Sequence, residues 1–108
     1  MSAAAQTLYR AVMANPPTAA DFMSNQAKGK PRRAPIEGEA EWSGISVYNT
    51  AERCRRKAVQ FGLGEYVAEL VIPGAAPIII GPLGKGGHCT LWGEPEQLLW
   101  CVTTVVPV

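Results

Sequence analysis

The stretch AERCRRKAVQFGLGEYVAELVI, residues 51–72, decides the fold class, because it joins one amphipathic helix to one alternating strand. In residues 51–61, small or apolar side chains recur at helical spacing and basic side chains occupy the opposite face. Gly62 and Gly64 then end the helical pattern. In residues 65–72 every second side chain falls on the same face, as in a half-buried strand. The stretch predicts a helix over Ala51–Phe61 and a strand over Glu65–Ile72.

The segments on either side complete a single-domain α+β pattern over residues 1–108. A capping box at Thr18–Asp21 predicts a second helix over Thr18–Lys28, and the proline-containing, highly charged segment Lys30–Glu41 is expected to be a loop. The other expected strands are Thr7–Met13, Gly44–Tyr48, Pro77–Ile80 and Leu98–Val106. The late strands follow one another without helices, which argues against a doubly wound parallel sheet. We therefore expect two helices on a mixed or antiparallel sheet of about five to six strands.

Composition restricts the cellular setting. Of the 108 residues, 47% are hydrophobic, and no apolar run approaches the length of a membrane span. The first residues lack the basic segment and apolar core of a secretion signal. The three cysteines have irregular spacing, which argues against a disulfide framework. We expect a reduced, cytoplasmic monomer or small homo-oligomer that does not bind membranes.

Two clusters hold most of the basic residues, although the net charge is only +1. The first lies within residues 28–33 and the second within residues 53–57, and each has an alternative interpretation as a solvated surface. The glycine-rich loop Gly81–Gly87 fits neither the Walker pattern nor the dinucleotide fingerprint, so we expect a hairpin loop. His88 and the cysteines lack metal-ligand spacing, and no metal site is predicted.

Three short motifs, which follow one another along the chain, contain the residues of a candidate site. Arg10 stands in the first strand, and Ser46 lies two residues before Tyr48 in the strand ahead of the amphipathic helix. Glu94 and Glu96 form a Glu-Pro-Glu sequence before the last strand. This order resembles the arginine–serine–glutamate subgroup of the ADP-ribosyltransferase superfamily, and the early Tyr-Arg pair is similar to that of RES-type toxins, which degrade NAD.

The resemblance implies an NAD-using ADP-ribosyltransferase or NAD glycohydrolase of the toxin or effector type. Glu96 would stabilise the developing oxocarbenium ion and Glu94 would orient the acceptor, while Arg10 would bind a phosphate, Ser46 the ribose and Tyr48 the nicotinamide. A protein or nucleic-acid acceptor and a neutralising protein would be its partners. The alternative is a non-enzymatic binding module: a regulator, an immunity-like protein, or a nucleic-acid-binding protein that uses the basic clusters.

Overall fold

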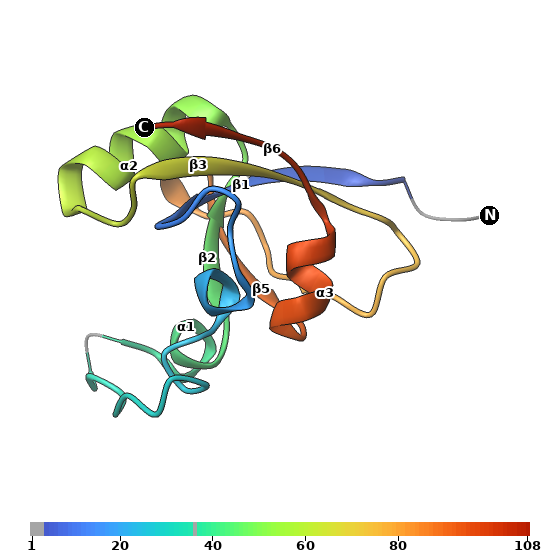
Figure 1. Ribbon diagram of the computed structural model, residues 1–108. Helices are drawn as coiled ribbons and strands as arrows, with labels where there is room; N and C mark the ends of the chain where they lie inside the picture. The colour runs from blue at the N-terminus through green and yellow to red at the C-terminus, as the bar shows by residue number, and fades with distance from the viewer. Residues whose placement is uncertain (1–3, 36) are drawn as a thin grey trace.

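The computed structural model describes residues 4–35 and 37–108, which form an α+β domain around one curled antiparallel sheet (Figure 1). The spatial order of its six strands is β4-β5-β2-β1-β3-β6. The strands are β1 (Gln6–Val12), β2 (Ile45–Tyr48), β3 (Tyr66–Ile72), β4 (Ile79–Ile80), β5 (His88–Trp92) and β6 (Val102–Pro107). The helices are α1 (Glu39–Ser43), α2 (Ala51–Phe61) and α3 (Pro95–Trp100), with short 3-10 turns η1 (Ala19–Phe22) and η2 (Lys85–Gly87).

The two predicted elements at the centre of the sequence are confirmed. Helix α2 spans Ala51–Phe61; the side chain of Thr50 accepts a hydrogen bond from the Arg53 N–H at its start, and Gly62 adopts the left-handed conformation at its end. Strand β3 alternates as expected and lies between β1 and the edge strand β6, hydrogen-bonded to β1 along its length. The predicted α+β class and antiparallel sheet are therefore correct.

Two cores cover the two faces of the sheet. The larger core receives Phe22 of η1 and Leu98 of α3, whose side chains are 1% and 0% exposed. The smaller core lies under α2, where Cys54 packs with Tyr48 and Val67. None of the helices in the described part of the chain combines the length and hydrophobicity that a membrane span requires.

The predicted helix Thr18–Lys28 is wrong beyond its first turn. The capping box of Thr18 and Asp21 forms, but only the 3-10 turn η1 follows it, and Met23 is already extended. The hydroxyl of Ser24 accepts a hydrogen bond from the Ala27 N–H, and the amide of Asn25 donates to Glu37. These side-chain bonds compete with helical hydrogen bonds and favour turns.

Two helices occur where none was predicted. The expected loop Lys30–Glu41 runs into α1, and the first residues of the expected strand Leu98–Val106 belong to α3. In α3 the sequence contained a usable signal, because Pro95 takes the first helical position, where a missing N–H costs nothing. The last strand therefore begins at Val102 rather than Leu98.

Candidate functional site

Strands β1 and β2 diverge, and this divergence creates the site. β1 pairs with β3 at every residue from Gln6 to Val12, but with β2 only at Tyr9, opposite Tyr48. β2 instead pairs with β5 from Ile45 to Tyr48. Beyond Tyr9 the two central strands are therefore not held together by a backbone ladder.

The side chain of Arg10 spans this divergence. Its Nε donates to the carbonyl oxygen of Asp21 at 2.7 Å, and its Nη1 donates to the carbonyl oxygen of Ser46 at 2.9 Å. Burial lowers the pKa of Arg10 to about 10, so the guanidinium still carries its charge at neutral pH. Arg10 thus ties η1 to β2 and places a fixed positive charge between the strands.

A cavity of about 490 Å³ opens beside Arg10. The segment between η1 and α1 forms one wall, and the C-terminal end of α2, with Phe61, forms another. The charged side chains that line the cavity are Arg10, Lys28, Arg33, Glu37 and Glu41. Burial lowers the pKa of Lys28, and the charges of Lys30 and Arg10 lower it further. We call this hollow the Arg10 cavity; its cations repel one another, and an anion would relieve that repulsion.

Glu37 organises the wall of the cavity. Its carboxylate is 8% exposed and accepts hydrogen bonds from Asn25 Nδ2 at 2.8 Å and from the Arg33 N–H at 3.2 Å. These hydrogen bonds hold the pKa of Glu37 below its usual range. Arg33 Nε lies 3.8 Å from the same carboxylate. Glu37 therefore folds the segment back on itself and keeps Arg33 at the cavity.

Ser46 and Tyr48 contribute the β2 side of the cavity. The hydroxyl of Ser46 is exposed, and its Oγ lies 3.0 Å from Nε2 of His88 on the neighbouring strand. The rings of Tyr48 and His88 meet edge to face, with centroids 5.6 Å apart. Burial raises the pKa of the Tyr48 hydroxyl, so Tyr48 is a neutral aromatic side chain at the site.

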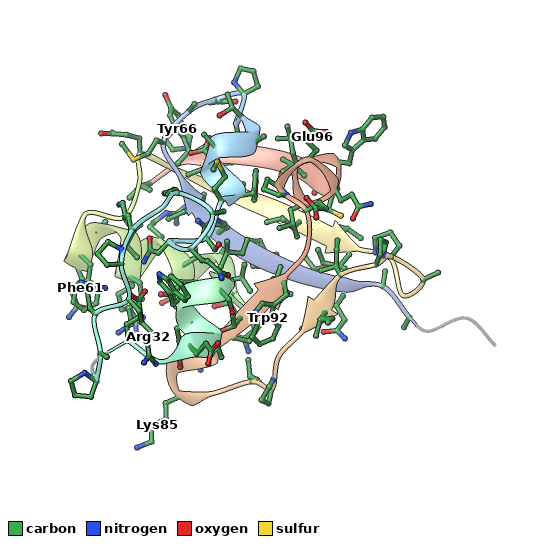
Figure 2. All side chains as sticks on the ribbon, turned by 90° about the horizontal axis from the view of Figure 1, so that it is seen from below. Arg32, Phe61, Tyr66, Lys85, Trp92 and Glu96 are labelled. Atoms are coloured by element: carbon green, nitrogen blue, oxygen red, sulfur yellow. The ribbon has the colours of Figure 1, made fainter. Side chains whose placement is uncertain are left out.

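Three of the five site residues predicted from the sequence lie together. Arg10, Ser46 and Tyr48 all line the Arg10 cavity. Glu94 and Glu96 lie at the start of α3 and are not among the described residues that line it. Figure 2 shows Glu96 well separated from Arg32 and Phe61. Strand β3 also lies between β1 and β6, so the last strand does not border the site.

The sequence did not predict the cations and carboxylates that α1 and the segment before it supply to the cavity. Lys28 and Arg33 belong to a basic cluster that is evident in the sequence, but nothing in its pattern predicts that the chain folds back toward β1. Within residues 4–35 and 37–108, no three His, Cys, Asp or Glu side chains are grouped closely enough to hold a metal ion. All three cysteines are free thiols, and burial raises the pKa of Cys54 to about 11.

A second cavity of similar size, about 510 Å³, lies beside α3. Its lining is mostly apolar and includes Pro73, Ile78 and Trp100, the last of which is 87% exposed. We call it the Trp100 groove. No charged side chain of the described residues lines it.

Comparison of the chain with family models, curated proteins and solved structures gives no match. The site is therefore interpreted from its own geometry.

Proposed function

We propose that this domain binds a phosphate-bearing nucleotide in the Arg10 cavity, with NAD as the first candidate. The observation that carries the proposal is the arrangement of Arg10, Lys28 and Arg33 around one cavity. Guanidinium groups match phosphate oxygens in geometry and charge. The cavity volume of about 490 Å³ falls in the range that small-molecule sites occupy.

Arg10 is prepared for such a ligand. Two backbone carbonyls already fix its Nε and Nη1, and no described residue accepts a hydrogen bond from its Nη2. A ligand phosphate would therefore meet a donor whose orientation is set before binding, which lowers the entropy lost on association. Phe61, which is 60% exposed, adds aromatic surface to the same cavity, against which a nicotinamide or adenine ring would pack, whereas Tyr48 lines the cavity but is only 7% exposed.

Cleavage of NAD would additionally require a carboxylate near the ribose. Glu41 of α1 fits that need better than Glu96, because Glu41 lines the cavity. Glu37, the other carboxylate of the cavity, is already engaged by Asn25 and Arg33. We therefore propose nucleotide binding as the primary function, and NAD glycohydrolysis or ADP-ribosyl transfer as the reaction that Glu41 would support.

The experiment is calorimetric titration of NAD, ADP-ribose and adenosine into the protein and its variants. NAD and ADP-ribose should bind and adenosine should bind far more weakly, because it lacks phosphates. Lys28→Ala should weaken ADP-ribose binding about tenfold. Lys85→Ala removes the same charge outside the cavity and should leave the affinity unchanged. Equal affinities for adenosine and ADP-ribose, or equal effects of the two variants, would reject the proposal.

Turnover is tested separately by measuring nicotinamide release from NAD. Glu41→Gln keeps the shape of the side chain and removes its charge, so release should fall, whereas Glu96→Gln should leave it unchanged. The opposite result would restore the assignment of Glu96 that the sequence suggested. Release that neither variant changes would show that neither carboxylate takes part.

Binding of nucleic acid is the second candidate, and one contact favours it. Nζ of Lys57 lies 5.3 Å from the ring centroid of Phe61, and Phe61 lines the Arg10 cavity. The basic face of α2 is therefore adjacent to the cavity that Arg10, Lys28 and Arg33 line. Oligonucleotide binding should weaken steeply with salt and on charge reversal at Arg55 and Arg56 if this candidate is right. Oligonucleotide binding that changes neither with salt nor on charge reversal would exclude this candidate.

A further inference from the structure

Ser46 and His88 form a polar pair that nucleotide binding does not require. Ser46 lies opposite Thr90, and Tyr48 lies opposite His88, in the β2–β5 ladder. Ser46 and His88 are therefore diagonal neighbours on one face of the sheet, close enough for long side chains to meet. Oγ of Ser46 and Nε2 of His88 are 3.0 Å apart, which is hydrogen-bonding distance.

Besides Ser46, one aromatic ring contacts the imidazole, and backbone hydrogen bonds fix the start of the strand that carries it. The ring of Tyr48 contacts the imidazole edge to face. The carbonyl oxygen of His88 accepts a hydrogen bond from the Gly84 N–H at 2.7 Å, and the carbonyl of Gly87 accepts one from the Asn49 N–H at 2.9 Å. Gly87 has a φ of 74°, and a Cβ there would collide with the Asn49 side chain. The chain can therefore enter β5 at this angle only through glycine.

A positive charge lies next to the backbone of the same serine. Nη1 of Arg10 is 2.9 Å from the carbonyl oxygen of Ser46. Ser46 lines the Arg10 cavity, so a ligand bound there by its anionic group would present its remaining atoms to the Ser46 hydroxyl. An exposed hydroxyl within hydrogen-bonding distance of an imidazole is the central pair of a serine nucleophile site.

We propose that Ser46 is a nucleophile and His88 its general base, and that the pair hydrolyses carboxylic esters that carry a phosphate or carboxylate group. Ser46 Oγ forms a bond to the ester carbonyl carbon as its proton moves to His88 Nε2. The carbon–oxygen bond to the alcohol then breaks, and the imidazolium returns the proton to the leaving alkoxide. Water, activated by His88, hydrolyses the acyl-serine and releases the acid. The preference for anionic esters rests on the proposed function of the Arg10 cavity as an anion site. The reactivity of the Ser46–His88 pair is independent of that proposal.

The pair is tested first with a fluorophosphonate probe on the full chain. Ser46 Oγ forms the bond to phosphorus and fluoride leaves, so the adduct is found by intact mass and peptide mapping. We expect labelling at Ser46, with Ser24 and Ser43 of the same protein unlabelled. His88→Gln preserves a polar side chain without a base and should slow labelling at least about a hundredfold. Circular dichroism checks that the variant is folded. Absence of labelling at Ser46, or equal rates in the folded His88→Gln protein, would overturn the proposal.

The substrate class is tested with two p-nitrophenyl esters, the neutral acetate and the anionic hemisuccinate. The wild type should hydrolyse the hemisuccinate at least about tenfold faster in kcat/KM, and Lys28→Ala should reduce this preference. Equal rates on the two esters would overturn the assigned substrate class. Ser46 labelling with no nucleotide binding would reject only the nucleotide proposal, and nucleotide binding with no labelling would reject only the nucleophile.

Discussion

The Arg10 cavity and the Trp100 groove have nearly equal volumes, about 490 and 510 Å³, but opposite chemistry. The first arises where two central strands diverge, and a charged side chain takes the place of ladder hydrogen bonds. The second lies between the short helix α3 and the segment that follows β3, and its lining is mostly apolar.

The difference shows how the same sheet produces two kinds of surface. A gap between strands exposes backbone carbonyls, which must be satisfied, and Arg10 donates to that of Ser46 in β2 as well as to that of Asp21 in η1. A gap beside a helix exposes mainly side chains, and apolar ones need no partner. The candidate site residues divide between these regions, with Arg10, Ser46 and Tyr48 at the first and Glu94 and Glu96 on the helix that borders the second.

The largest expected effect is on the free energy of unfolding, and it should differ sharply between substitutions of two residues of α3. Leu98 is fully buried against η1 and the sheet, so Leu98→Ala should lower the free energy of unfolding by about 2–5 kcal/mol. Trp100 is 87% exposed, and Trp100→Ala should change the free energy of unfolding by no more than about 0.5 kcal/mol. Urea denaturation measures both. A large loss on Trp100→Ala would show that the groove is filled by its own tryptophan in solution.

The next effect tests whether Arg10 holds the diverging strands together. Arg10→Met keeps much of the aliphatic length but leaves the carbonyls of Asp21 and Ser46 without their donor, which should cost about 1–3 kcal/mol. Urea denaturation again gives the value. A gain in stability would mean that the cost of burying the guanidinium exceeds the two hydrogen bonds, and that Arg10 is retained for a ligand alone.

A smaller effect concerns the pH dependence of anion binding. The pKa of Arg10 is lowered to about 10, so Arg10 is protonated and able to bind anions below that pH and loses this ability as pH rises through 10. The affinity of Lys28→Ala for ADP-ribose, whose phosphates do not change ionisation in this range, should therefore be constant from pH 7 to about 9 and fall across pH 10. The Lys28 variant is used because burial also lowers the pKa of that lysine. Affinity that persists to pH 11 would contradict the location of the anion beside Arg10.

The smallest effect is a difference in thiol reactivity between the two regions. Burial raises the pKa of Cys54, under α2, to about 11, whereas Cys101, at the Trp100 groove, is only half-buried. In the native protein at pH 8, iodoacetamide should alkylate Cys101 first and Cys54 last. Mass spectrometry gives the order, and the denatured protein should show three reactive thiols. Fast alkylation of Cys54 would show that α2 opens readily.

The parts of the fold that follow from local pattern were predictable. The helix Ala51–Phe61 and the strand after it have regular periods and clear ends. Helix α1 and the fold-back of residues 23–35 depend instead on contacts distant in sequence. Among them are the hydrogen bonds from the Gln26 N–H to the Trp42 carbonyl and from Trp42 Nε1 to the Lys30 carbonyl. No period in the sequence encodes such bonds, so Lys28 and Glu37 could not be placed at the site in advance.

The measurement that tests the central claim most directly is chemical-shift mapping of ADP-ribose on the ¹⁵N-labelled protein. We predict perturbed backbone amides at Arg10, Lys28, Arg33 and Ser46, with those of Gln97, Trp100 and Thr103 at the Trp100 groove unchanged. Perturbations confined to the groove, or none at a ligand concentration of several millimolar, would contradict the assignment of the Arg10 cavity as the ligand site.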